Sequence, residues 1–425
     1  MVKIEKIIPG GFGLGTLDDG KKAFFWNVLP GETVLEYNAT KQKSHYIEAI
    51  ATEITNPSPF RTEPRDACYL STSPWQIINY DYELKLKSEL VTEIFREHHI
   101  NIDTPEIFTD GHDYHYRNKM EYALYWDNNT NKIQLAFHAR GSHRKVPITQ
   151  SSIERPEIFA TATEIVNMLN QNHAEARTYQ SLLLRCNQKG EVSGGLYENH
   201  KPHPVFKNLT DTILGHEYSY SPNGFFQINL PVYEMALKEI KKHITTDRVL
   251  DLYSGVGTIG LSVARDHHLT LVECDKSAYR EMEKNIAKMN RIEIGHDNTA
   301  FEEHIRQRGE YGATEPRNDG REGAFRESGI IMPKAVLAKS EDVLGYIAPD
   351  QTVILDPPRA GCDSKLIDKL NEVRPTKIIY LSCNPATQAR DVKLLLDNYT
   401  IDEVKTFNFF PHTPHIENLV ILTRK

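Results

Sequence analysis

The stretch DRVLDLYSGVGTIGLSVA, residues 247–264, indicates the fold of the C-terminal half of the chain. An apolar run ends at Leu252, three glycines follow, and the apolar residues after them have helical spacing. Glycine tolerates positive φ and lets the backbone approach a ligand closely. The order is therefore typical of a strand, a tight turn and a helix.

The same rhythm continues downstream. LTLVECD (269–275) predicts a second strand, and a helix is predicted over 276–290. TVILDPPRAG (352–361) and KIIYLSCNPAT (377–387) predict two more strands that end in loops. Strands that alternate with helices form a mostly parallel sheet with helices on both faces. We therefore predict an α/β, Rossmann-like domain over 226–425.

The glycine turn and the next strand together indicate a nucleoside-bearing cofactor. A glycine turn alone matches either a dinucleotide or S-adenosylmethionine. Asp251 precedes the glycines and favours S-adenosylmethionine, because that ligand has no pyrophosphate for a carboxylate to repel. Glu273 ends the next strand, where a carboxylate can accept hydrogen bonds from both ribose hydroxyls.

Polar residues follow two later strands. Asp356 and Cys383 stand at predicted carboxyl ends of strands, where open α/β sheets bind their ligands. In the C-terminal stretch FNFFPHTPHIE, His412, His415 and Glu417 precede a last apolar run. Histidine or glutamate could serve there as a base. We therefore expect a thiol and a base to face one crevice.

The rest of the chain reads as smaller units. Residues 1–55 alternate short apolar runs with turn signals, which predicts a small β-barrel with either a structural or an oligonucleotide-binding role. A proline-rich linker follows over 56–66, and helical spacing covers about 76–98. Residues 292–333 are dense in charge and glycine and predict a mobile insertion between two strands.

Residues 112–150 predict antiparallel strands in which cations and rings are interleaved. Cations neutralise phosphates and rings stack on bases, so the pattern suits single-stranded RNA, although a solvated strand face is the plainer interpretation. The cations are Arg117, Lys119, Arg140, Arg144 and Lys145, and the rings are Tyr114, Tyr116, Tyr122, Tyr125, Phe137, His138 and His143.

Composition limits the class of protein. The chain has 425 residues, a net charge of −8 and 39% hydrophobic residues, which is typical of a soluble protein with two or three domains. It has no apolar run near the roughly 20 residues of a membrane helix, and the first residues lack the apolar core of a secretory signal. Its five scattered cysteines argue against a zinc site or a disulfide framework. We expect a cytoplasmic protein.

Two C-terminal blocks carry a resemblance to a known family. DPPRAGC (356–362) with IIYLSCNPAT (378–387), and then FNFFPHTPHIE (407–417), resemble the RNA uracil-5 methyltransferases in sequence and spacing. SPNGFFQIN (221–229) resembles the cofactor-binding segment of that family. The likeness covers nearly the whole chain apart from 292–333.

The resemblance implies three domains. Residues 1–58 would form an OB-like barrel of the TRAM type, 59–225 a mixed α/β RNA-binding domain, and 226–425 the S-adenosylmethionine-dependent methyltransferase domain. The helix about 76–98 could pack on that last domain.

The resemblance also implies roles for individual residues. Carbon 5 of uracil is a poor nucleophile, and addition of the Cys383 thiolate to C6 turns C5 into an enolate carbon that can attack a methyl group. Glu417 would then remove the C5 proton. The residues assigned to the methyl donor are Gln227, Tyr253, Thr258, Glu273 and Asp356. Arg117 and Arg359 are assigned to phosphate or to the enolate.

Three departures from the family pattern matter. Many members hold an iron–sulfur cluster with four cysteines, but here 63–76 contains only Cys68 and the later position falls near 151–152. One thiolate cannot hold such a cluster, so we predict none. Thr258 stands where the family often has Asn, and Asn408 where it usually has Asp.

Other functions fit less of the sequence. Amino-group methyltransferases place an aromatic residue after Asp-Pro-Pro, where this chain has Arg359. RNA cytosine-5 methylation would also use a thiol, but the block PHTPHIE favours uracil. A non-catalytic RNA-binding or RNA-remodelling protein is the alternative of another class. The barrel favours 23S ribosomal RNA as the substrate, with transfer RNA as the alternative, and we expect a monomer.

Overall fold

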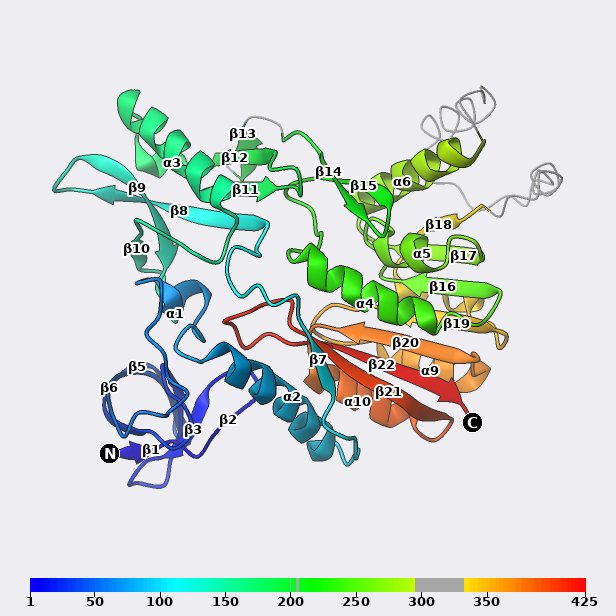
Figure 1. The fold of residues 1–425 in the computed structure, drawn as a ribbon, viewed down its shortest axis with the longest axis horizontal. Coiled ribbons are helices and arrows are strands. Elements are labelled where there is room, and N and C mark those ends of the chain that lie inside the picture. The colour runs from blue at the N-terminus through cyan, green and yellow to red at the C-terminus, as the bar shows by residue number, and fades with distance from the viewer. Residues whose placement is uncertain (199, 204–205, 295–331) are drawn as a thin grey trace.

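The computed structural model of the protein describes residues 1–198, 200–203, 206–294 and 332–425 (Figure 1). Each helix in these ranges is too short or too polar to cross a membrane. Most of the predicted insertion, 295–331, lies outside the described residues. The helix before it continues to Ile294, two residues beyond the predicted start of the insertion.

An eight-stranded sheet forms the C-terminal part of the molecule, in the order β18-β17-β16-β19-β20-β22-β21-β7. The first five strands in this order, from β18 to β20, are parallel. Strand β22 is antiparallel to both of its neighbours, and β7 is parallel to β21. The bounds are β16 Arg248–Leu252, β17 His268–Glu273, β18 Lys334–Leu337, β19 Gln351–Leu355, β20 Lys377–Ser382, β21 Tyr399–Phe407, β22 Glu417–Arg424 and β7 Glu106–Phe108. The predicted α/β class is confirmed.

Helices cover both faces of this sheet (Figure 1). Side chains alternate along a strand, so Ile378 and Tyr380 of β20 pack into one hydrophobic cluster and Ile379 and Leu381 into the other. The first cluster includes α2 (Tyr80–Glu97), α9 (Ser364–Val373) and α10 (Pro385–Leu395), and the second includes α4 (Leu230–Lys242), α5 (Thr258–Val263) and α6 (Lys276–Ile294).

Helix α2 begins later than predicted. The side-chain oxygen of Asn79 accepts hydrogen bonds from the main-chain N–H groups of Asp81 and Tyr82, which caps the helix at Tyr80. Gln76, predicted to be helical, lies before this cap and binds Asp66 instead. Strand β7 and helix α2 thus both pack on the C-terminal sheet.

The central sheet has six strands in the order β10-β9-β8-β11-β12-β13. It is covered by helix α3 (Pro156–Gln171). Its strands are β8 Lys119–Asp127, β9 Lys132–His138, β10 Lys145–Pro147, β11 Ser181–Cys186, β12 Val192–Glu198 and β13 Lys201–His203. The antiparallel strands expected within 112–150 are β8 to β10. A hairpin, β14 (Leu209–Ile213) and β15 (His216–Tyr220), leads to the C-terminal sheet.

The N-terminal sheet has the order β1-β5-β6-β4-β3-β2. Its strands are β1 Val2–Lys3, β2 Lys6–Ile7, β3 Gly13–Thr16, β4 Lys22–Trp26, β5 Thr33–Gln42 and β6 Tyr46–Thr55. The two edge strands follow each other along the chain with only two residues between them, so the edges meet and the sheet curls around its own core (Figure 1). Closure of this kind gives a small barrel.

Candidate active site

The glycine turn joins β16 to α5 with three residues at positive φ. Tyr253 has a φ of 64°, Gly255 of 58° and Gly257 of 86°. The neighbouring Gly260 must lack a side chain, because a Cβ there would lie 2.8 Å from Asp251 Oδ2. Its N–H donates to that oxygen at 2.9 Å, so the helix start is tied to the end of the strand.

Glu273 lies beside this turn at the end of β17. One carboxylate oxygen accepts the N–H of Gly255 at 2.8 Å and the other accepts the N–H of Asp275 at 2.6 Å. Both oxygens retain a further lone pair. The carboxylate is therefore fixed next to the turn and can still accept hydroxyl donors.

Three carboxyl groups gather behind the turn. Asp251 and Glu417 are buried and Asp356 is partly buried. Burial raises the pKa of Asp251 to about 8 and that of Asp356 to about 7. Burial, and then the charge of Asp356, raise the pKa of Glu417 well above its ordinary value, while Arg359 opposes the rise. These acids retain protons where ordinary carboxyl groups have lost them.

Cys383 follows β20 and is half-buried in the same place. Burial, Glu417 and Asp356 raise the pKa of its thiol to about 11, and Arg359 opposes them. Only groups that lie close together exert such effects, so the thiol, both carboxyl groups and the guanidinium share one site. The side chain of Asn384 fixes the loop, since its oxygen caps α10 and its amide donates to the carbonyl of Arg359 at 2.8 Å.

His415 stands at the exposed side of this site. Its Nδ1 lies 3.5 Å from Arg359 Nη2, and its ring packs edge-on against Phe410 with ring centroids 5.6 Å apart. Surrounding protein and the cations Arg359 and Lys87 lower the pKa of His415 to about 4. A weakly basic imidazole is a poor proton acceptor near neutrality, so Glu417 is the better of the two candidate bases.

The remaining predicted residues lie around this centre. Gln227 is buried, and its carbonyl accepts the amide of Asn118 at 3.0 Å. Thr258 is the first residue of α5 and is also buried. The Nε of Arg117 donates to the carbonyl of Lys119 at 2.9 Å, and its charge also lowers the pKa of His415.

The side chain of Tyr253 points elsewhere. Burial, and then the nearby Cys362 and Glu341, raise the pKa of its phenol. Its ring packs on the hydrophobic cluster that contains α9 and α10. The structure therefore brings Cys383, Asp356, Glu417 and Arg359 together, and leaves Tyr253 near the cofactor turn through its backbone.

Two residues near the site, Tyr233 and Phe225, were not predicted from the sequence. Tyr233 is buried in α4, and the charges of Asp356, Asp251 and Glu417 act on its phenol, which has a strongly raised pKa because of burial. In the sequence, Tyr233 has the spacing of an ordinary apolar residue in an amphipathic helix, so nothing marks it as part of a site. Phe225 is 74% exposed beside Gln227, where a ring can stack on a base. The segment SPNGFFQIN was the available signal for Phe225.

The prediction that the aromatic rings of 112–150 face RNA is wrong for some of them. Tyr122 and Phe137 are buried in the core of the central sheet, as is Tyr116. Strand alternation turns these rings inward, whereas His138 and Arg144 remain exposed. Burial thus removes three of the seven rings from any RNA surface.

The residues around the glycine turn fit S-adenosylmethionine. A Cβ on Gly255 would meet no heavy atom within 4 Å, so the turn faces open space. Asp251 Oδ1 and Asn229 Oδ1 are buried and find no hydrogen-bond donor within the described ranges. Buried acceptors of this kind suit a ligand that brings its own donors. The ammonium and ribose hydroxyls of S-adenosylmethionine are such donors.

One family model covers the residues around the thiol. The model described as tRNA (Uracil-5-)-methyltransferase matches residues 344–425, which include Asp356, Cys383 and Glu417. The C-terminal part of the chain is thus similar to the uracil-5 methyltransferases. A second model, described as Conserved hypothetical protein 95, matches residues 231–314.

Relatives match this chain over almost their whole length. A protein of Prochlorococcus marinus described as an uncharacterized RNA methyltransferase is 28% identical over 460 aligned positions, which cover 93% of this chain and 99% of the relative. A Lactobacillus johnsonii protein of the same description is 27% identical, with 96% and 94% covered. The chain is thus similar over almost its whole length to proteins described as RNA methyltransferases.

A solved structure shares the complete fold. Pyrococcus abyssi tRNA (uracil-54, C5)-methyltransferase, in complex with S-adenosyl-L-homocysteine, matches with a TM-score of 0.71 over 100% of both chains. The sequences are 21% identical, so the match shows a common fold.

The position of the predicted missing cluster is filled by polar residues. Cys68 Sγ lies 3.9 Å from the carbonyl of Gln150. Asp66 accepts the main-chain N–H of Ser152 at 3.0 Å and its hydroxyl at 2.7 Å. Within the described ranges no three His, Cys, Asp or Glu side chains are grouped as metal ligands would be. The lack of a cluster stays a prediction, which iron analysis of anaerobically purified protein would test.

Proposed function

We propose that the protein methylates C5 of a specific uridine in RNA through a covalent adduct between Cys383 and C6 of the base. The observation that supports the proposal is the pairing of Ser382 with Asn418, which puts Cys383 beside Glu417, with Asp356 and Arg359 close enough to influence both of their pKa values. A thiol beside a carboxyl group of raised pKa provides a nucleophile and a base in one pocket.

The thiol must lose its proton before it adds to C6. Its pKa of about 11 means that it is a thiol in the resting protein at neutral pH. Arg359 is the neighbour that favours the thiolate, whereas Glu417 and Asp356 oppose it. When the S–C6 bond forms, the electron pair of the C5=C6 double bond moves to C5 and O4, and the guanidinium of Arg359 can stabilise the resulting enolate.

The second task of the site is removal of a proton. Bound S-adenosylmethionine supplies an electrophilic methyl group. Once C5 carries that methyl group, the carboxylate of Glu417 takes the remaining C5 proton, the C5=C6 bond forms again and the C6–S bond breaks. A base works best when its pKa is close to the working pH, and burial next to Asp356 shifts the pKa of Glu417 in that direction.

We propose Glu273, Asp251 and the backbone of the glycine turn as the cofactor site, with Gln227, Thr258 and Asp356 around it. Glu273 would accept the ribose hydroxyls, because its two oxygens are already oriented by the N–H groups of Gly255 and Asp275. Asp251 offers an oxygen with no donor inside the described ranges.

RNA recognition is proposed for the two N-terminal units. We propose that residues 1–58 are a TRAM-like barrel and that 59–225 contain the RNA-binding sheet, acting in a cytoplasmic monomer. The guanidinium of Arg140 lies 4.1 Å from the ring of Trp26, which links the barrel to the central sheet. A barrel and sheet joined in this way can present one continuous surface to a folded RNA.

The proposed substrate is 23S ribosomal RNA, which the N-terminal barrel favours. Transfer RNA is the second candidate, because the matching family model is described by a tRNA activity. An RNA-binding protein without catalysis is the alternative of another class. It would bind RNA and transfer no methyl group.

The test is transfer of tritiated methyl groups from S-adenosylmethionine to unmodified tRNA and rRNA, followed by nucleoside mass spectrometry. We expect 5-methyluridine in one of the two RNA classes with wild-type protein and none with Cys383→Ala. Cys383→Ser is the closest isosteric control and should also be inactive, since a hydroxyl is a far weaker nucleophile. An active Cys383→Ala variant would refute the adduct, and a wild-type protein that binds RNA without transfer would favour the non-catalytic alternative.

A further inference from the structure

The loop 408–416 joins the two strands that end beside the site. Phe407, the last residue of β21, is paired with Glu417, the first residue of β22. The loop therefore leaves the sheet and returns next to the proposed base. His412 stands at its middle, buried and with a φ of 59°, a conformation that side-chain-bearing residues seldom adopt.

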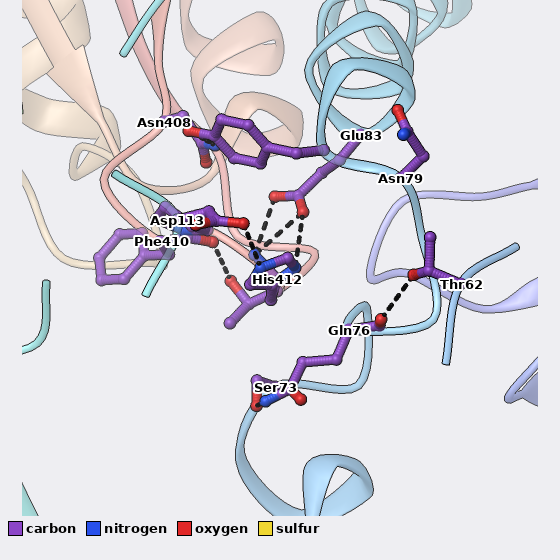
Figure 2. Close-up of polar contacts among 12 residues, drawn as sticks. Thr62, Ser73, Gln76, Asn79, Glu83, Asp113, Asn408, Phe410 and His412 are labelled. Atoms are coloured by element: carbon purple, nitrogen blue, oxygen red, sulfur yellow. Dashed lines mark hydrogen bonds and ion pairs between the residues drawn. The ribbon is translucent and has the colours of Figure 1, made fainter. Parts of the chain in front are cut away.

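His412 is held from two sides by carboxylates (Figure 2). Its main-chain N–H donates to both oxygens of Glu83 at 3.0 Å. Its ring Nε2 lies 3.2 Å from Asp113 Oδ2, and Nδ1 lies 3.5 Å from Glu83 Oε2. The two partners come from helix α2 and from the segment before β8, so they approach the loop from different parts of the chain.

A buried lysine completes the same arrangement. Lys87 and Glu83 are both fully buried, one helical turn apart, and Lys87 Nζ lies 2.8 Å from Glu83 Oε1. Lys87 also donates to Asn408 Oδ1 at 2.6 Å and to the carbonyl of Phe410 at 3.0 Å. Its charge is therefore balanced by Glu83, and its other protons bind the loop itself.

We call the group Glu83, Lys87, Asp113, Asn408 and His412 the loop clamp. Asp113 shows that the imidazole contact matters electrostatically, since the hydrogen bond with His412 is the main cause of its lowered pKa. Four of the five members are at least 96% buried around the loop: Glu83, Lys87, Asn408 and His412.

The clamp holds the loop that leads into the proposed base, whereas the proposed nucleophile lies on another segment. The loop carries His415 and runs directly into Glu417. Cys383 is held by a different set of contacts, the capping side chain of Asn384 and the end of β20. A disturbed clamp should therefore displace the base relative to the C5 proton and leave the nucleophile in place.

We propose that His412 is a positioning residue, which through Glu83 and Asp113 holds loop 408–416 so that Glu417 can take the C5 proton of the methylated adduct. The inference rests on the proposed function of Cys383 and Glu417. It adds a group that touches neither substrate nor cofactor and that acts through the loop backbone.

The test compares His412→Asn with a matched control. Asparagine accepts positive φ better than most residues, so the change keeps the backbone conformation while it removes the imidazole. His99 has the same φ of 59° and is exposed, which makes His99→Asn the same substitution at the same conformation outside the clamp. Asp113→Ala, at a partly exposed position, removes one ring partner and leaves the loop sequence intact.

The decisive readout is the covalent adduct. For His412→Asn we expect kcat to fall about tenfold or more, with Kd values for RNA and S-adenosylmethionine changed less than about threefold. We also expect an RNA–protein adduct that survives denaturing gels, as for Glu417→Gln. Asp113→Ala should shift both quantities in the same direction by a smaller factor, and His99→Asn should match wild type.

Two results would overturn the proposal. One is wild-type turnover in His412→Asn. The other is a turnover loss without adduct, which would mean that the clamp only supports folding. If His412→Asn does not fold, Asp113→Ala decides by the same criteria. Failure of Glu417→Gln to trap any adduct would instead refute the proposed function, so the two failures are distinguishable.

Discussion

Two sets of carboxyl groups, one in the candidate site and one in the loop clamp, differ in the partners that surround them. In the site, Asp251, Asp356 and Glu417 have raised pKa values and take part in none of the ion pairs found within the described ranges. In the loop clamp, Glu83 is paired with Lys87 at 2.8 Å, and Asp113 has a lowered pKa because of His412.

The difference lies in the partners, because both groups contain fully buried carboxyl groups. A carboxylate with a cation at hydrogen-bond distance remains ionised and holds structure together. Carboxyl groups that face one another must share protons, which costs stability and provides a base near neutral pH. The comparison predicts that charge-removing changes lower the free energy of unfolding in the clamp and leave it equal or higher in the site.

The largest expected effect comes from Glu417→Gln compared with Glu83→Gln. Glu417→Gln should lower turnover by roughly 10³-fold, because it removes the base that resolves the methylated adduct. The free energy of unfolding should stay equal or rise, since the repulsion with Asp356 disappears. Glu83→Gln should lower that free energy by about 3 kcal/mol, because Lys87 is left buried without its anion. Steady-state turnover assays and urea unfolding measure the two quantities.

A Glu83→Gln variant as stable as wild type would contradict this division of roles. So would a Glu417→Gln variant that unfolds easily and still turns over.

Lys87→Met tests the clamp from the side of the cation. The change should lower the free energy of unfolding by about 3–5 kcal/mol, because Glu83 becomes an unpaired buried charge. The double variant Lys87→Met/Glu83→Gln should recover most of that loss, and urea unfolding would show it. A double variant as unstable as Lys87→Met would mean that packing, and not charge, decides the effect.

Asp356→Asn tests the site through pH. The pKa of Asp356 rises from 3.8 to about 7 on folding, so the folded protein keeps a proton that the unfolded chain has lost. The raised pKa contributes to the free energy of unfolding. This contribution is fully present below pH 4 and is lost as pH rises to 7. Asparagine does not titrate, so Asp356→Asn does not lose this stability as the pH rises. Between pH 4 and pH 7 its free energy of unfolding should therefore rise by about 2–3 kcal/mol relative to that of wild type, allowing for the partial exposure of Asp356.

Urea unfolding at pH 5 and pH 8 compares the two proteins directly. A difference between wild type and Asp356→Asn that does not change with pH would show that Asp356 is ionised in the folded state.

The smallest effect is expected where the barrel touches the loop. A Cβ on Gly11 would lie 2.3 Å from Pro414 Cβ, whereas a Cβ on Gly10 would meet nothing nearer than 3.9 Å. Both glycines have a φ near 90°, so Gly10→Ala and Gly11→Ala carry the same backbone strain. We expect Gly11→Ala to lower the free energy of unfolding more than Gly10→Ala, because Pro414 must move, and to lower turnover about threefold where Gly10→Ala does not.

Equal turnover in Gly10→Ala and Gly11→Ala would mean that the barrel does not influence the loop. In that case its contact with Pro414 would only fill space.

The site was predictable where the chemistry follows local patterns. Asp356 and Cys383 end parallel strands, and the carboxyl ends of parallel strands meet at one edge of a sheet. Glu417 required the resemblance, because its place depends on β22 running antiparallel beside β20, with Asn418 opposite Ser382. The residues of either strand alone do not predict the register in which the two strands pair.

The RNA-facing rings show the opposite case. The interleaved pattern counted Tyr122 and Phe137 among the stacking residues, yet both lie in the core. Alternation along a strand is visible in sequence, but which face meets α3 is decided by packing alone. The same holds for the start of α2, where apolar spacing continued through the residues before the Asn79 cap.

The amino-acid sequence by itself determined the α/β class, the glycine turn and the thiol at a strand end, because these depend on spacing within a few residues. The loop clamp was decided only by tertiary structure. Glu83 and His412 are 329 positions apart, and their contact exists because α2 packs on the C-terminal sheet. No periodicity reports a contact between segments so distant, so the charges that stabilise each other and those that do chemistry could be separated only in three dimensions.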